Sequence, residues 1–245
     1  MVQLPYPQTE GQDGLRLNVV GLCVAPASGI PSSDLLRDVT LSLRKGEIVG
    51  VMGESGSGKT TLFRAVLGLL SSGLVASGTV RLLGVDLYGE VSKSEIRLAR
   101  RRIAFVSQNP YAGFVPDVSI GRQLRFLADS RGFKDDILDG AERLLLELGL
   151  KHPVKALRSL PRQLSGGQLQ RLQLALALLV RPDLILADEI TASLDPNNAK
   201  RVAHVLLEHH QEHGTTVLLA SHDLWLIQLL CDHWYRVEDR ALLLQ

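Results

Sequence analysis

Short apolar runs alternate with amphipathic stretches along this chain, and the alternation predicts strands and helices in turn. Residues 15–24 (LRLNVVGLCV) alternate apolar and polar positions, as a half-buried strand does. Residues 36–52 predict two more strands joined at 44–47, and the second is a continuous apolar run typical of a buried strand. A glycine-rich turn then leads into an amphipathic helix, and residues 77–87 predict a further strand pair.

The second half of the chain changes character twice. Residues 96–108 predict a basic helix followed by a strand, and residues 109–181 are almost wholly helical, with leucines at a period near 3.6. A buried strand follows at 183–189, then a helix over 196–213 and a strand over 215–222, and the chain closes with a helix and short strands. This order predicts an α/β core with a parallel sheet and a helical insertion.

Composition and charge narrow the class of protein. The 245 residues are 45% hydrophobic and 22% charged with a net charge of +1, which is typical of a globular protein and gives no electrostatic reason to expect nucleic acid as a partner. Residues 1–14 lack the pattern of a signal peptide and predict a flexible leader. The longest apolar runs are far shorter than the roughly 20 residues of a membrane helix. Cys23 and Cys231 predict buried thiols in a reducing compartment.

One glycine-rich segment carries a specific chemistry. Residues 53–60 (GESGSGKT) match the pattern G-x-x-x-x-G-K-[ST], in which backbone N–H groups form an anion nest at a helix N-terminus. Lys59 would supply positive charge to the β- and γ-phosphates, and the Thr60 hydroxyl would ligate Mg²⁺. A merely structural Gly/Ser turn is the alternative, but a buried strand leads in and a helix leads out. The predicted phosphate-binding residues are Gly53, Glu54, Ser55, Gly56, Ser57, Gly58, Lys59, Thr60 and Thr61.

A phosphate loop of this kind needs a second strand that carries a carboxylate. The run LILADE ends in Asp188 and Glu189, so Asp188 is the candidate metal ligand and Glu189 the candidate base for the attacking water. Acidic residues at a strand end are common and weak evidence alone. Together with the phosphate loop, they predict a nucleotide-hydrolysing site.

Taken in order, GESGSGKTT, Gln108, LSGGQLQR, LILADE, SLD and His222 resemble the ATP-binding-cassette (ABC) ATPases from about residue 15 onwards. The resemblance implies an α/β P-loop NTPase (RecA-like) core with a parallel sheet, an N-terminal antiparallel β subdomain and a helical signature subdomain. We therefore expect one ABC ATPase domain over 15–245. Its core would span about 15–108 and 182–245, and its helical subdomain about 109–181.

The resemblance also implies roles for single residues, with ATP and Mg²⁺ as ligands. Gln108 would contact Mg²⁺ or the water and act as a sensor, and His222 would contact the γ-phosphate. Ser193, Leu194 and Asp195 would form a loop across a subunit interface. A polar strand cap at Gln108 and a structural histidine at His222 are the alternatives that the residues alone leave open.

The segment LSGGQLQR is the family's signature, and it implies a site shared between two chains. Ser165, Gly166, Gly167 and Gln168 would open a helix whose positive end faces the nucleotide of the opposite subunit. A simple helix N-cap by Ser165 is the alternative. That alternative predicts no local reason for Gly167 or Gln168, so we expect a head-to-tail dimer with a second ABC ATPase, either a copy or a paralogue.

Two positions depart from the family pattern. Ile190 follows the candidate base where most members have proline, which predicts a less rigid backbone there. Pro26 aligns with an aromatic residue that usually stacks on adenine, and the nearest other aromatic, Tyr6, lies in the leader. We expect weaker base stacking, by about 1 kcal/mol.

The motifs look most like those of the dipeptide, oligopeptide and nickel importer ATPases. The resemblance implies a peripheral protein on the cytoplasmic face of the inner membrane, which powers import of peptides, nickel or a metal–chelate complex. Its partners would be two integral-membrane permeases and, indirectly, a substrate-binding protein. Alternatives are an exporter or lipoprotein-release ATPase, a non-hydrolysing module, and an ABC ATPase that acts on nucleic acid. The last lacks the coiled-coil insertion, zinc cysteines and basic stripe that it would need.

Three surface features stay open between two interpretations. Tyr111 and Phe114 predict an exposed dock for a permease helix, or else aromatics packed into the helical subdomain. His209 and His213 have the i, i+4 spacing of metal ligands but no placed third ligand, so a surface histidine run is favoured. The run 100–102 (RRR) predicts a solvated face, with a lipid-headgroup contact as the minority alternative.

Overall fold

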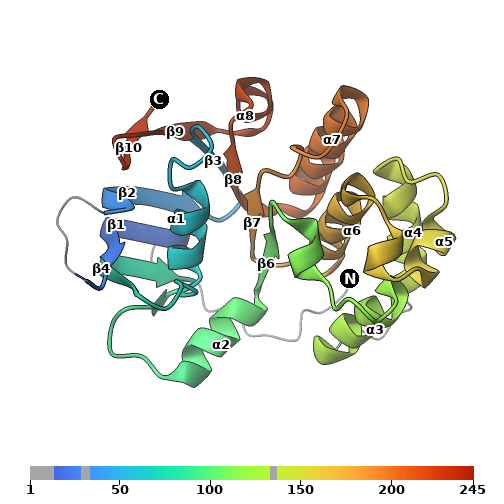
Figure 1. The fold of residues 1–245 in the computed structure, drawn as a ribbon, viewed down its shortest axis with the longest axis horizontal. Helices are drawn as coiled ribbons and strands as arrows, with labels where there is room; N and C mark the ends of the chain where they lie inside the picture. Colours follow the sequence, from blue (N-terminus) through green and yellow to red (C-terminus); the bar gives the residue numbers. More distant parts are fainter. Residues whose placement is uncertain (1–13, 29–33, 133–136) are drawn as a thin grey trace. The chain divides into compact units, whose positions relative to one another are not determined.

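The computed structural model describes residues 14–28, 34–132 and 137–245, which form two compact units (Figure 1). The sheet unit contains the described residues up to Ala104, together with Asp183–Asp188 and Gly214–Gln245. The helical unit contains Phe105–Pro182 and Glu189–His213. Tyr6 and the rest of the expected leader up to residue 13 lie outside the described residues.

An antiparallel sheet forms the N-terminal part of the sheet unit, in the order β2-β1-β4-β5. Along β1 the alternation seen in the sequence becomes a buried face, with Leu17, Val19, Leu22 and Val24 fully buried. The expected antiparallel β subdomain is therefore confirmed. Its strands are β1 (Leu15–Pro26), β2 (Leu36–Arg44), β4 (Leu74–Leu82) and β5 (Val85–Asp86).

The second sheet has the order β10-β9-β3-β8-β7-β6, and its inner strands run parallel. Strands β7 and β8 are buried along their whole length, as expected for a parallel sheet covered on both faces. Helices α1 (Lys59–Val66) and α8 (Leu224–Leu230) pack on it. This is the predicted P-loop NTPase core. Its strands are β3 (Ile48–Met52), β6 (Ile103–Val106), β7 (Leu184–Asp188), β8 (Thr216–Ser221), β9 (His233–Glu238) and β10 (Ala241–Leu244).

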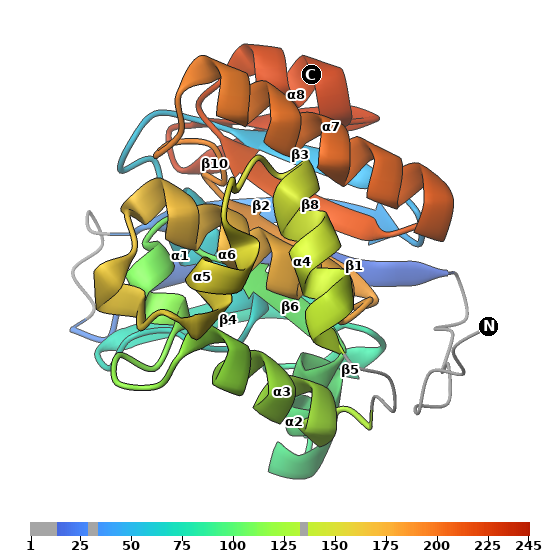
Figure 2. The same ribbon diagram turned by 90° about the vertical axis from the view of Figure 1, so that its right-hand side faces the viewer.

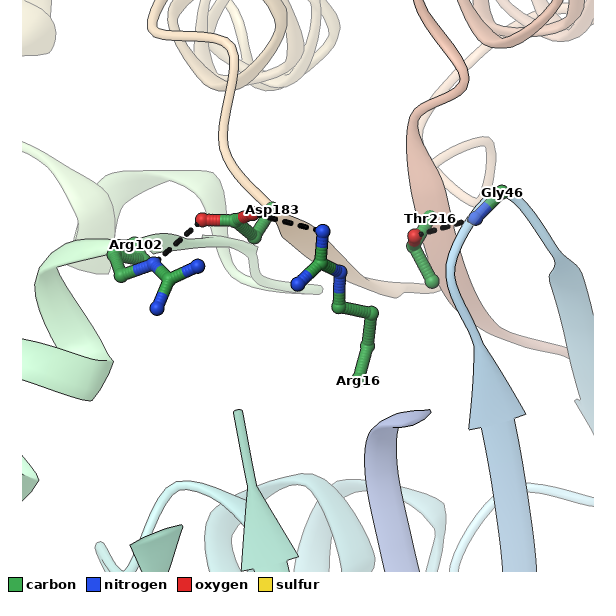
Figure 3. Close-up of polar contacts among 5 residues, drawn as sticks. All are labelled: Arg16, Gly46, Arg102, Asp183 and Thr216. Carbon is green, nitrogen blue, oxygen red and sulfur yellow. Dashed lines mark hydrogen bonds and ion pairs between the residues drawn. The ribbon is translucent and has the colours of Figure 1, made fainter. Parts of the chain in front are cut away.

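A buried charge cluster joins separate segments of the sheet unit (Figure 3). Asp183 accepts from Arg102 Nε at 2.7 Å, and its other carboxylate oxygen lies 3.3 Å from Arg16 Nη2. Their side chains are only 5–15% exposed. Nearby in the same view, the Gly46 N–H donates to Thr216 Oγ1 at 2.9 Å.

The cluster corrects the prediction that the run 100–102 is a solvated face. Arg102 is in the buried cluster, and Arg100, in α2 (Lys93–Arg101), donates to the carbonyls of Leu67 and Gly68 just after α1. These carbonyls lack partners inside their own helix, so a cation at the end of α1 satisfies them. Only Arg101 of the three is exposed.

The helical unit contains the long helical stretch that the leucine period predicts, and α3, α4, α5 and α6 pack against one another (Figure 2). In the part of the chain that the structure describes, no helix has both the length and the apolar character to span a bilayer. The elements are η1 (Pro110–Gly113), α3 (Ile120–Ser130), α4 (Ile137–Glu147), α5 (Pro153–Arg158), η2 (Pro161–Gln163), α6 (Gly166–Leu179) and α7 (Pro196–His213).

Candidate functional site

The predicted phosphate loop lies in the sheet unit, between β3 and α1. Gly58 adopts φ 110°, and a Cβ there would lie 3.0 Å from Leu36 Cδ2 and 3.1 Å from the Leu35 carbonyl oxygen. Gly56 also has a positive φ, of 82°, but in the described part of the chain no atom lies within 4 Å of a Cβ built there. Gly58 is thus required by the chain's own packing, whereas Gly56 lies on the open side of the loop, where a ligand can approach the backbone.

Lys59 holds its positive charge inside this loop. Its side chain is buried, at 6% exposure, and Nζ donates to the carbonyl oxygens of Gly53 at 2.7 Å and Glu54 at 2.9 Å. The ammonium group is therefore fixed within the loop, next to the N-terminus of α1. Both features favour binding of an anionic group.

Thr60 and Asp188 form the pair expected of a metal site. Thr60 Oγ1 donates to Asp188 Oδ2 at 2.8 Å, and Asp188 is 1% exposed at the carboxyl end of β7. A hydroxyl and a carboxylate oxygen at this distance fit Mg²⁺, which prefers hard oxygen ligands. No group of three or more His, Cys, Asp or Glu side chains occurs among the described residues that could cage a metal alone. The pair suits an ion that binds through one or two protein oxygens and substrate phosphates.

His222 follows β8 and is exposed, in a turn that is held on both sides. The Asp223 N–H donates to Ser221 Oγ at 3.0 Å, and Asp223 Oδ1 accepts from the Trp225 N–H at 2.9 Å, which caps α8. His222 is therefore carried by a rigid turn at the carboxyl end of a parallel strand, the edge of α/β sheets where ligands bind.

The signature segment starts α6 in the helical unit. Ser165 is the N-cap and forms a capping box with Gln168, in which Ser165 Oγ accepts from the Gln168 N–H at 3.3 Å and Gln168 Oε1 accepts from the Ser165 N–H at 2.9 Å. A Cβ on Gly167 would lie 3.1 Å from the Ser193 carbonyl oxygen and 3.2 Å from Leu194 Cδ2.

These contacts show that the expectation of no local reason for Gly167 and Gln168 is wrong. Gln168 is explained locally by the capping box, and Gly167 by the close approach of residues 193–194, so neither requires a second chain. Gly166 differs, because a Cβ there would meet no atom of the described residues within 4 Å. Of the four signature residues, Gly166 is the glycine whose small size the surrounding chain does not explain.

Asp195 caps the next helix of the same unit. Its Oδ1 accepts from the Asn197 and Asn198 N–H groups, both at 3.1 Å, and its Oδ2 accepts from Asn198 Nδ2. These hydrogen bonds, those from Asn198 first, lower the pKa of Asp195. Asn198 Oδ1 in turn accepts from Arg171, the last residue of the signature segment. The signature helix and the Asp195 loop are therefore joined within one chain.

Glu189 directly follows Asp188 and has a strained backbone. It adopts φ 53°, in the left-handed region that costs a non-glycine residue about 1–2 kcal/mol. Its carbonyl oxygen accepts from the Ala192 N–H at 3.1 Å, and its side chain is 5% exposed. Ile190, which replaces the usual proline, is 1% exposed. Strain of this kind is common at catalytic residues.

Two surface predictions are decided by burial. Phe114 is 7% exposed, so the prediction that it belongs to an exposed dock is wrong, whereas Tyr111 is 47% exposed. His209 and His213 lie edge to face with ring centroids 4.5 Å apart. Burial and the nearby His213 lower the pKa of His209 to about 4. Among the described residues, no group of three or more potential metal ligands includes this pair.

The two cysteines are free thiols of intermediate exposure, not fully buried as expected. Burial raises the pKa of Cys231 to about 12, so this thiol is held in its protonated, unreactive form.

Comparisons with known proteins bear on the same residues. A family profile described as ABC transporter matches residues 36–192. A Brucella ovis protein named putative peptide import ATP-binding protein is 34% identical over 218 residues, which are 88% of this chain and 67% of that protein. The Escherichia coli K12 protein named uncharacterized ABC transporter ATP-binding protein YbbA is 38% identical over 214 residues, 85% of this chain and 88% of YbbA.

Solved structures with similar folds also include ATP-binding cassettes of ABC transporters. The structure of cbiO1 from Clostridium perfringens, part of the ABC transporter complex cbiONQ, has a TM-score of 0.75 and 26% identity over 95% of this chain and 88% of that chain. A dimeric ATP-binding cassette bound to ADP and Pi has a TM-score of 0.74 over 92% of this chain and 96% of that chain, and at 24% identity it supports the fold alone.

Proposed function

The chain belongs to the ABC transporter ATP-binding family, and we propose that it is the subunit whose ATP hydrolysis powers a membrane importer of peptides. Membership of this family confirms the sequence prediction of an ATPase. The observation that carries the proposal is the Thr60–Asp188 hydrogen bond at the start of α1, beside a lysine fixed in the phosphate loop. The peptide as cargo is supported by the name of the Brucella relative. Nickel or a metal–chelate complex is the alternative cargo within the same group of importers.

The chain's own residues divide the work of hydrolysis. The loop 53–61 binds the phosphates through backbone N–H groups and Lys59, and Thr60 and Asp188 hold Mg²⁺, with Gln108 as a further ligand and sensor. When bound, Mg²⁺ neutralises charge that develops on the β- and γ-phosphates. Glu189 takes a proton from the attacking water.

The remaining residues act on the γ-phosphate, and some act in a second chain. We assign His222 to the γ-phosphate, on the rigid turn between Ser221 and Asp223. Ser165, Gly166 and the amide end of α6 face the nucleotide of a second ABC ATPase in a head-to-tail dimer, and Asp195 lies at that interface. The open position at Gly166 supports this assignment.

We further propose that two permease subunits anchor the protein on the cytoplasmic face of the inner membrane, with a substrate-binding protein as an indirect partner. The permease dock includes Tyr111 and Val115, which are 47% and 56% exposed, but excludes the buried Phe114. An exporter or lipoprotein-release role is the second candidate.

The test of hydrolysis is Glu189→Gln. This change removes the base and leaves the phosphate loop intact, so we expect ATP to bind with wild-type affinity while turnover falls at least about 100-fold. ATP should then hold the variant as a dimer in size-exclusion chromatography. Glu212→Gln makes the same change at a position 72% exposed on α7 and should keep wild-type turnover. Turnover by Glu189→Gln within twofold of wild type would reject the role of Glu189.

The transporter role has a separate test. Membranes of a host that expresses the tagged chain should yield integral-membrane permeases on affinity purification, and reconstitution of that complex in vesicles shows the direction of transport. Transport of peptide away from the side of the vesicle membrane that holds the ATPase and ATP would contradict the importer assignment. Purification without any permease would contradict it as well.

A further inference from the structure

The turn that carries Gln108 is tied down on both sides of that residue. Ser107 Oγ donates to the Asn109 carbonyl oxygen at 2.8 Å, so this hydrogen bond spans Gln108. Asn109 Oδ1 then accepts from the Tyr111 N–H at 3.1 Å and caps η1. Gln108 itself is exposed. The backbone around the sensor residue is therefore held, while its side chain remains accessible.

The signature helix supplies the other half of this arrangement. From α6, Gln173 Nε2 donates to Ser107 Oγ at 3.1 Å, and Gln170 Nε2 makes a longer contact of 3.4 Å to the Ser107 carbonyl oxygen. Tyr111 connects the turn back to the start of α6. Its hydroxyl donates to the carbonyl oxygen of Leu164 at 3.2 Å, one residue before Ser165. The contacts form a closed ring from α6 through the Gln108 turn and back to the start of α6.

Ser107 acts as a relay in this ring. Its hydroxyl accepts from Gln173 and donates to Asn109, and hydrogen bonds in such a series polarise and strengthen one another. The packing around Gln173 is tight, since a Cβ on Gly113 would clash with Gln173 Nε2. Gly113 therefore leaves the space through which the amide of Gln173 reaches the turn.

Stability alone does not account for these two glutamines. Gln170 is 1% exposed and Gln173 7% exposed, and in both side chains Oε1 has no hydrogen-bond partner among the described residues. A buried acceptor without a partner is unfavourable, and an apolar side chain of similar size would avoid that cost. The neighbouring buried positions of α6 are leucine and alanine. The glutamines thus keep a directional contact to Ser107 at a cost in stability.

We propose that Gln173 is a positioning residue which, through Ser107, holds the Gln108 turn on the signature helix, so that Gln108 and the Ser165 end of α6 move as one body. This inference rests on the proposed function only for the effect on catalysis. In that setting, it means that a shift of the signature segment, when a second subunit engages it, is transmitted to the nucleotide sensor of the same chain.

The test is Gln173→Met, which keeps the length and volume of the side chain and removes both the donor and the unpaired acceptor. Because it deletes a buried acceptor without a partner, we expect the urea midpoint of unfolding to stay at or above that of wild type. Exchange of the amides in residues 107–114, followed by hydrogen–deuterium mass spectrometry, should rise about fivefold, the factor of one neutral hydrogen bond. Ser107→Ala removes the relay hydroxyl without changing α6, and it should raise the exchange of the same amides.

Catalysis supplies the second readout. Gln173→Met should raise the Mg²⁺ concentration for half-maximal ATPase activity at least fivefold, because the turn that carries Gln108 is no longer held. In the Gln108→Ala background it should have no further effect, since a positioning residue acts only through its target. Gln211→Met makes the same change at an exposed position of α7 and should alter neither readout.

Each result decides the proposal. Unchanged exchange in residues 107–114 with both Gln173→Met and Ser107→Ala would overturn it, as would additive losses in the double variant with Gln108→Ala. Loss of stability in Gln173→Met with wild-type exchange and Mg²⁺ dependence would assign a purely structural role instead. If the wild-type chain hydrolyses no ATP, the proposed function fails, and the exchange measurement still decides whether the turn is held.

Discussion

The two adjacent glycines of the signature segment allow a matched experiment, because the same added methyl group meets different surroundings at each. Gly166→Ala places the methyl where none of the described residues has an atom within 4 Å. Gly167→Ala places it 3.1 Å from the Ser193 carbonyl oxygen and 3.2 Å from Leu194 Cδ2. A methyl group at Gly166 therefore displaces none of the described residues, whereas at Gly167 it displaces the loop at Ser193 and Leu194.

The expected magnitudes follow from these distances. At Gly167 the neighbours must give way by a few tenths of an ångström, and overpacking of this kind costs about 1–3 kcal/mol of the free energy of unfolding. At Gly166 the methyl fits, and alanine is the better helix former by up to about 1 kcal/mol, so stability should stay the same or rise. ATPase activity and ATP-dependent dimerisation should fall at least about tenfold in both variants, which is about 1.4 kcal/mol of lost binding or activation.

The assay compares stability with function in the same preparations. Urea unfolding followed by circular dichroism measures the first, and steady-state ATPase rates with analytical ultracentrifugation in ATP measure the second. A stable Gly166→Ala variant that still dimerises with ATP and hydrolyses it at the wild-type rate would refute the idea that a second subunit approaches Gly166. A strongly destabilised Gly166→Ala variant would show instead that the chain has no room for a methyl group at this position.

Three further outcomes follow from burial and charge. Asp183→Asn leaves two buried arginines without their carboxylate and should lower the free energy of unfolding by about 3 kcal/mol, whereas Asp117→Asn breaks an exposed ion pair and should cost less than about 1 kcal/mol by urea titration. Phe114→Asp buries a carboxylate and should lower the thermal midpoint sharply in differential scanning fluorimetry; a folded variant with uncoupled transport would contradict the burial of Phe114. Burial lowers the pKa of His209 from 6.5 to about 4, so below pH 6.5 the unfolded chain binds a proton that the native chain does not, and stability should fall as the pH is lowered from about 6.5 to 4. His209→Gln should flatten that dependence, and His204→Gln, at a position 74% exposed, should leave it unchanged.

Local patterns in the sequence predict most of the fold and the identity of the candidate site residues. Alternation in β1, the apolar runs of β3, β7 and β8 and the leucine period of the helical unit depend on neighbours along the chain, and such patterns reflect which face of an element is buried. The phosphate loop and the strand end at Asp188 can be predicted from the sequence for a similar reason. Their chemistry lies in residues a few positions apart, and the spacing itself is what binding requires.

Contacts between distant segments were decided by the tertiary structure alone. Periodicity cannot show that Arg102 meets Asp183 or that Arg100 caps α1, and so the arginine run was predicted wrongly as a solvated face. It cannot show that Phe114 is buried, or that Gly167 is small because residues 193–194 pass over it. The link from Gln173 to the Gln108 turn belongs to the same class, since its partners are 66 residues apart. A side chain's nearest neighbours in space are set by packing, and packing brings together residues whose separation along the chain carries no signal.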